Sequence, residues 1–182
     1  MRLFIGVWLS EAMKKEVLEY IKRIQKSGSG WKWTTPDNLH FTLRFLGEVP
    51  EYKVADLARA LKMAVAGESA FRLSLGKAGF FPTSGPPRIL WLDVAVGGDS
   101  LVKLAGAVEN CCRQQGFPKA DKPFKPHLTI ARAKSDLPKI NLAEPEFKFK
   151  SETGVTGVAL IESRLFSAGP VYQTIELFKL VD

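Results

Sequence analysis

The pattern of apolar and polar residues in the first half of the chain changes period several times. Residues 2–9 are a compact apolar run rich in strand formers and predict a buried strand. After Ser10, a favourable N-cap, apolar residues recur at helical spacing and predict a helix over 11–26. Glycine and serine at 27–30 end that helix. The chain therefore begins with a strand followed by an amphipathic helix.

Further alternation follows in the same half. Residues 31–35 predict a short strand and residues 38–49 a longer one. Pro50 opens a second helix, which has one apolar face and ends near Gly67. Residues 71–81 then predict another strand, and the Pro- and Gly-rich segment after it predicts a loop.

The second half repeats this order. Residues 88–96 predict a strand, and Asp99 or Ser100 is expected to cap a helix that closes at Gly116. A loop leads to a strand over 127–133. The remaining residues predict three more strands, over 146–152, 154–166 and 170–180. Strands outnumber helices and several follow one another directly, which favours an α+β fold with antiparallel sheets.

The chain has two histidines, and both head the same four-residue pattern, His-x-Thr-(Leu/Ile). His40 begins HFTL in the first half, and His127 begins HLTI in the second. Phe4 precedes His40 by 36 residues, as Trp91 precedes His127. Each half thus has a strand, a helix, a loop and a histidine strand, which indicates an internal repeat.

The repeated pattern gathers groups suited to chemistry at phosphorus. On a strand, residues two apart share a face, so His40 is expected beside Thr42 and His127 beside Thr129. Two imidazoles can serve as an acid and a base near neutral pH, and threonine hydroxyls can donate to phosphoryl oxygens. By the same alternation Arg44 lies on the His40 face. A structural role for each histidine and a metal site are alternatives, the latter weakened by the lack of neighbouring acidic or cysteine ligands.

Composition narrows the setting. The chain has 182 residues, of which 46% are hydrophobic and 25% charged, as expected for one globular domain or two small lobes with a common core. Its net charge of +7 favours a polyanionic partner, although a basic solvated surface gives the same value. Cys111 and Cys112 are adjacent and poorly placed for a disulfide, which fits a reducing cytosol. We expect a soluble cytoplasmic protein, because no signal peptide or membrane span is evident.

Taken together, the motifs resemble the 2H phosphoesterase superfamily, and within it the RNA 2′,3′-cyclic phosphodiesterases, long called 2′-5′ RNA ligases. The segments WTTPDNLHFTLRFLGEV and KPHLTIAR are similar to the two motif blocks of that family, and SRLFSAGPVYQTI to its C-terminal block. The resemblance covers essentially the whole chain. It implies one bilobal domain over residues 1–182, with two pseudo-twofold-related lobes of antiparallel sheet, helices on the outer faces and a central cleft.

The resemblance also implies a reaction and roles for residues. A terminal 2′,3′-cyclic phosphate of RNA would be hydrolysed to a 2′-phosphomonoester without cofactor or metal. His40 would protonate the leaving 3′-oxygen and His127 would activate water, while Thr42, Thr129 and Arg132 would bind the phosphate. Simple alternation puts Arg132 on the face opposite His127, so this role requires a bulge or a strand end between them.

Other residues and readings stay open. Lys122 and Lys125 can steer RNA or form an ordinary solvated loop, and four aromatic residues can stack on bases or belong to the core: Trp33, Phe80, Phe81 and Tyr172. The expected partner is RNA with a 2′,3′-cyclic phosphate end, bound by a monomer. An RNA-end binding module without turnover is one alternative. A phosphodiesterase for a small cyclic nucleotide, such as ADP-ribose cyclic phosphate, is another.

Overall fold

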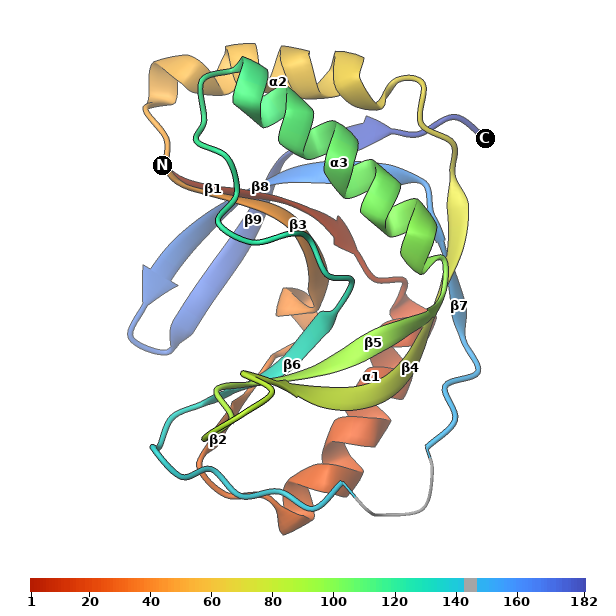
Figure 1. The fold of residues 1–182 in the computed structure, drawn as a ribbon, viewed down its shortest axis with the longest axis vertical. Helices are drawn as coiled ribbons and strands as arrows, with labels where there is room; N and C mark the ends of the chain where they lie inside the picture. The colour runs from red at the N-terminus through yellow and green to blue at the C-terminus, as the bar shows by residue number, and fades with distance from the viewer. Residues whose placement is uncertain (143–146) are drawn as a thin grey trace.

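The computed structural model describes residues 1–142 and 147–182 and contains two antiparallel sheets (Figure 1). The four-stranded sheet has the order β3 (His40–Glu48), β1 (Arg2–Trp8), β8 (Gly157–Phe166) and β9 (Gly169–Lys179). The five-stranded sheet has the order β2 (Trp31–Trp33), β6 (Leu128–Ala133), β5 (Ile89–Val96), β4 (Phe71–Phe81) and β7 (Glu152–Val155). The predicted bilobal α+β fold with antiparallel sheets is confirmed.

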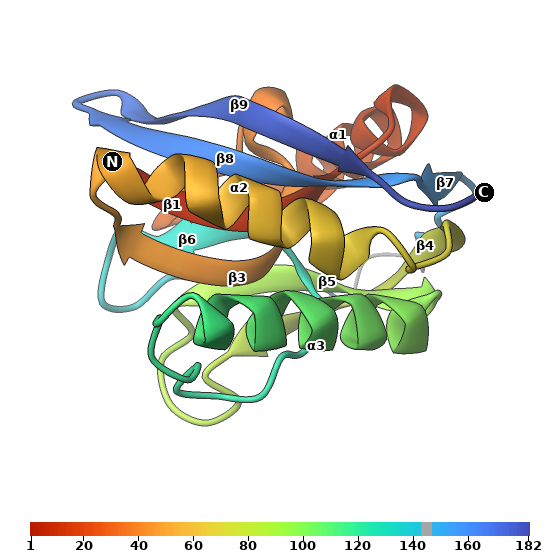
Figure 2. The ribbon, with the colours of Figure 1, turned by 90° about the horizontal axis from the view of Figure 1, so that it is seen from above.

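The helices have the amphipathic faces that the sequence predicts. α1 (Glu11–Ile24) begins after Ser10, whose side chain accepts from the Met13 amide, and contacts β7 of the five-stranded sheet. α2 (Glu51–Val65) and α3 (Gly98–Gln114) lie side by side and contact β9 and β3 respectively (Figures 1 and 2). In the described part of the chain, no helix is long and apolar enough to cross a membrane.

The predicted cap of α3 is wrong. The N-cap is Gly97, which has φ 83° and makes no side-chain cap bond, and Asp99 and Ser100 lie inside the first turn. A Cβ at Gly97 would fall 2.2 Å from the Arg72 carbonyl oxygen, so both the backbone conformation and the close approach require glycine. Asp99 still interacts favourably with the positive end of the helix dipole.

The prediction for the segment before β7 is also wrong. Of the expected strand 146–152, Glu146 lies outside the described residues and residues 147–151 form no strand. Phe147 and Phe149 instead pack on Tyr20 of α1, with ring centroids 5.3 and 5.6 Å away. Their alternation thus serves packing on a helix. The expected strand 154–166 is divided between β7 and β8, because the chain passes from one sheet to the other between them.

The two sheets correspond strand by strand. The order β3-β1-β8-β9 matches β6-β5-β4-β7, with β2 added beside β6, and in each sheet the histidine strand pairs with the strand that opens its half. The equal 36-residue spacings do not mark equivalent positions, however. Gly6 lies opposite Thr42, whereas Trp91 lies opposite Thr129. The repeat is therefore one of topology and not of strict residue spacing.

Each strand of the four-stranded sheet divides its side chains between two faces. Leu3, Ile5 and Val7 join the main core, which also includes residues from both sheets and all three described α-helices. Phe4 joins a small second cluster on the other face, with Ala159 and Ile161 and the partly buried Trp8 and Tyr172. β3 contacts β6, so the two histidine strands meet in the middle of the molecule.

Candidate active site

Both histidine strands are interrupted by a bulge at the same place in the motif. In β3, Thr42 lies opposite Gly6 and Arg44 opposite Ile5, which leaves Leu43 without a partner. In β6, Thr129 lies opposite Trp91 and Ala131 opposite Leu90, which leaves Ile130 unpaired. One extra residue in a strand reverses the alternation of the side chains that follow. After the fourth residue of each motif, the side chains therefore point to the opposite faces from those that simple alternation predicts.

The bulge at Ile130 brings Arg132 onto the face of the motif. Arg132 lies opposite Ile89, two residues before Trp91, so it shares a face with Trp91 and Thr129. The bulge is stabilised by Thr34, whose amide donates to the Ile130 carbonyl (2.9 Å) and whose hydroxyl donates to the Thr129 carbonyl (3.2 Å). The condition for a phosphate contact by Arg132 is therefore met.

The bulge at Leu43 has the opposite consequence for Arg44. The expectation that Arg44 lies on the His40 face is wrong, because alternation reverses one residue earlier. Its guanidinium forms an ion pair with Glu109 of α3, at 2.8 Å, and donates to the Pro118 carbonyl. Arg44 therefore joins β3 to α3, on the side of the sheet away from the motif.

The His40 ring is fixed at both nitrogens. Nδ1 lies 2.7 Å from the Asn38 carbonyl oxygen, and Nε2 lies 2.9 Å from Thr42 Oγ1. A carbonyl only accepts, so Nδ1 carries a proton and donates. Nε2 then accepts from the Thr42 hydroxyl when the ring is neutral and can donate when it is charged. The predicted pairing of His40 with Thr42 on one face is confirmed by this contact.

His127 is held in a similar way. It lies immediately before β6, which begins at Leu128 and not at the expected residue 127, and its Nδ1 is 2.7 Å from the Lys125 carbonyl oxygen. In both motifs the carbonyl two residues upstream thus selects the same tautomer. Among the described residues Nε2 of His127 has no hydrogen-bond partner, so it can accept a proton from a bound molecule.

Aromatic rings contact both imidazoles. The ring centroid of His40 lies 4.7 Å from that of Phe4, 5.1 Å from Tyr172 and 5.7 Å from Trp8. His127 has Phe81 edge-on at 5.2 Å. These rings restrict rotation of the imidazoles, and both histidines stay partly exposed.

Burial and nearby cations keep both rings neutral. Burial lowers the pKa of His40 to about 4, partly offset by the Asn38 carbonyl. The charge of Arg132 lowers this pKa further, as does His127 when its ring is protonated. The pKa of His127 is lowered as well, by burial first and then by the charges of Arg132 and Lys125. Arg132 thus acts on both histidines, which is expected of a cation between the two motifs.

The remaining candidates divide between core and site. Trp33 and Phe80 pack against the main core, whereas Phe81 and Tyr172 contact the histidines. The Lys125 ammonium lies 5.1 Å from the Phe81 ring centroid, in a cation–π contact. Lys122 is exposed in the preceding loop.

Sequence reasoning missed two residues near His40. The Asn38 side-chain amide donates to the Pro170 carbonyl (2.8 Å), and the indole of Trp8 donates to Thr174 Oγ1 (3.0 Å). Asn38 therefore joins the backbone support of His40 to the start of β9. Its position two residues before the histidine, matched by Lys125 before His127, is the signal that points to its backbone role.

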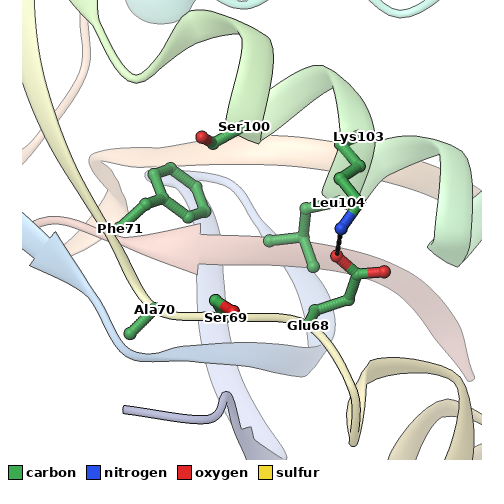
Figure 3. A pocket seen from close by; sticks show the side chains of 7 residues that line it. All are labelled: Glu68, Ser69, Ala70, Phe71, Ser100, Lys103 and Leu104. Carbon is green, nitrogen blue, oxygen red and sulfur yellow. Dashed lines mark ion pairs between the residues drawn. The ribbon is translucent and has the colours of Figure 1, made fainter.

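Two other features lie outside this arrangement. In the described ranges, no group of three or more His, Cys, Asp or Glu side chains is placed to hold a metal ion. A small hollow between the α2–β4 loop and α3, crossed by an ion pair between Glu68 and Lys103 at 3.0 Å, includes none of the predicted site residues (Figure 3).

Each sheet contributes one bulged histidine strand, so the arrangement is duplicated on a bilobal scaffold. The match to a known family is duplicated as well. A model of the LigT-like phosphoesterase family matches residues 7–91 and again residues 92–172. The chain belongs to this phosphoesterase family.

Relatives support this assignment over the full length. The chain is 36% identical over 186 residues to an RNA 2′,3′-cyclic phosphodiesterase of Thermus thermophilus, covering 99% of this chain and 90% of the relative. It is 36% identical to one of Archaeoglobus fulgidus, covering 98% of this chain and 100% of the relative. A Thermus thermophilus crystal structure superposes with a TM-score of 0.83 at 34% identity, over 99% of this chain and 98% of that one. E. coli LigT in complex with 3′-AMP gives 0.82 at 25% identity, over 100% and 98%.

Proposed function

We propose that this protein hydrolyses the terminal 2′,3′-cyclic phosphate of RNA to a 2′-phosphomonoester by general acid–base catalysis. The observation that carries the proposal is the matched setting of His40 and His127: each has Nδ1 bound to the carbonyl two residues upstream, and Arg132 affects both. The names of the curated relatives support the substrate class.

The proposed steps use Nε2 of each ring, because Nδ1 is held by a backbone carbonyl in both. His127 Nε2 takes a proton from water, whose oxygen attacks phosphorus as the bond to O3′ breaks. His40 Nε2 gives its proton to O3′, so the phosphate stays on O2′. Thr42, Thr129 and Arg132 bind the phosphoryl oxygens and stabilise the charge that develops there. Turnover ends with His127 charged and His40 neutral, and proton exchange with solvent restores both.

The acid role of His40 requires the substrate. With a pKa of about 4 in the free protein, His40 is neutral at pH 7 and cannot donate a proton to O3′. An anionic phosphate beside Nε2 favours the charged ring and raises this pKa, while its negative charge also offsets the field of Arg132. Protonation of His40 is thus coupled to phosphate binding.

We further propose that residues 1–182 act as one monomeric, metal-independent domain in a reducing, cytoplasmic compartment. A second proposed activity is 2′-5′ ligation, in which the 5′-hydroxyl of another RNA end attacks the cyclic phosphate in place of water and O3′ again leaves. The common core of both sheets supports a single domain. Cys111 and Cys112 are both free thiols, which fits the compartment. Imidazoles, hydroxyls and a guanidinium supply the acid, the base and the charge stabilisation without a metal ion.

The test is turnover of an oligoribonucleotide with a 2′,3′-cyclic phosphate end. We expect a product that resists a phosphatase specific for 3′-phosphates, and a loss of at least about 100-fold in kcat for His40→Ala and His127→Ala. Circular dichroism of both variants checks that they fold. Binding of the oligonucleotide without turnover would favour an RNA-end binding module, and turnover of only ADP-ribose cyclic phosphate would favour a small-molecule substrate.

A further inference from the structure

Two cations lie directly opposite each other beside the second motif. Lys32 on β2 pairs with Arg132 on β6, so their side chains leave the sheet on the same face. Like charges in this position destabilise a sheet. Among residues 1–142 and 147–182, neither has a carboxylate within ion-pair distance. The pair is therefore a place where an anion is favourable.

The lysine ammonium has a defined position. Nζ of Lys32 donates to the Ala168 carbonyl in the β8–β9 turn at 3.3 Å. A Cβ added at Gly169 would lie 3.2 Å from the same Nζ atom. Two residues after Ala168, at the start of β9, the Pro170 carbonyl accepts from the Asn38 side chain. Since the Asn38 carbonyl also binds His40, the Lys32 ammonium lies near the turn that adjoins the His40 motif.

The chemistry of RNA decides which anion fits. In a 2′,3′-cyclic end, the next phosphodiester is attached through C5′ and C4′ to C3′, so it lies on the O3′ side of the ribose. The proposed function puts His40 at O3′. A cation close to the His40 motif, and one strand away from Arg132, is therefore on the path of the RNA chain leading to the cyclic phosphate.

On the basis of the proposed function, we propose that Lys32 binds the phosphodiester on the 5′ side of the terminal nucleotide and so favours oligonucleotides over mononucleotides. The contact to Ala168 uses one of three ammonium donors, which leaves two for phosphate oxygens. The side chain is exposed, so an RNA strand can reach it. Lys32 is then a positioning residue for substrate length, and the chemical step belongs to the two motifs.

The experiment compares two substrates, an oligoribonucleotide with a cyclic phosphate end and a nucleoside 2′,3′-cyclic monophosphate. For Lys32→Gln we expect the ratio of kcat/KM, oligonucleotide over mononucleotide, to fall about tenfold, mainly through KM. The slope of log KM for the oligonucleotide against log salt should fall by about 0.7 in magnitude, the value for one phosphate contact on a single strand. Lys32→Arg should restore both. Lys62→Gln, on the exposed side of α2, is the matched control and should change neither.

The outcomes separate this inference from the proposed function. Wild-type protein that hydrolyses neither substrate contradicts the proposed function itself. Suppose that the wild-type protein hydrolyses both substrates, and that Lys32→Gln loses activity equally on the two with an unchanged salt slope. Lys32 then only holds the β8–β9 turn, and the inference is overturned. An unchanged ratio with normal activity overturns it as well.

Discussion

Acid should destabilise this protein through His40. The folded state holds the ring neutral with a pKa of about 4, against an ordinary value of 6.5. Between pH 4 and pH 6.5, His40 is protonated in the unfolded chain and neutral in the folded one. The contribution of His40 to stability is therefore complete above about pH 6.5, declines as the pH falls, and reaches its limit near pH 4.

The size of this effect follows from the two pKa values. Between pH 7.5 and pH 4.5 the charging of His40 in the unfolded state should cost about 2.5 kcal/mol of stability. His40→Gln cannot titrate, while the carboxylates and His127 titrate in both proteins. Because these groups act on both proteins alike, the wild-type protein should lose about 2.5 kcal/mol more than the variant over this pH range.

Urea unfolding followed by circular dichroism at both pH values measures the difference, and NMR titration of the two imidazoles assigns it. Sulfate, which keeps its charge in this range, should raise the pKa of His40 if an anion makes it an acid. Equal losses in the two proteins, or a pKa of His40 near 6.5 without an anion, would refute the argument from burial. An unchanged pKa in saturating sulfate would remove the coupling between phosphate binding and the acid role.

The remaining predictions concern the two arginines and metal ions. Arg132→Met should lower kcat/KM about 10- to 100-fold, because it removes a charge-assisted contact to phosphate. Steady-state kinetics measures this loss, and an unchanged kcat/KM in a folded variant would contradict the phosphate contact. Arg44→Met should leave kcat/KM within about twofold but lower stability by about 1–3 kcal/mol in urea unfolding, since Glu109 loses its cationic partner and keeps only the Ala120 amide; a selective loss of activity would place Arg44 in the site. EDTA should not change turnover, and activity that is lost with EDTA and restored by a divalent ion would indicate metal-assisted hydrolysis.

Sequence periodicity predicted most elements because most strands have one buried face and the helices keep one apolar side. It failed where the register changes. Leu43 and Ile130 look like ordinary apolar positions, and only pairing with β1 and β5 makes them bulges. Alternation therefore put Arg44 on the wrong face, and it could only state a condition for Arg132.

Long-range contacts account for the other errors and omissions. The apolar residues Phe147 and Phe149 alternate as in a strand, but Tyr20 on α1 uses them as packing partners. The inference about Lys32 depends on its pairing with Arg132 across the sheet and on its bond to Ala168 in a distant turn. Local sequence contains no record of such neighbours, whereas the two histidine motifs are local and could be found directly.

The central claim is that His40 is the acid and His127 the base, and a substrate with sulfur in place of O3′ tests it most directly. A thiolate leaves without protonation, so the loss caused by His40→Ala should shrink by about 100-fold on this substrate while that of His127→Ala persists. The assignment would be contradicted if the sulfur substrate restored the activity of His127→Ala, or if it failed to restore that of His40→Ala.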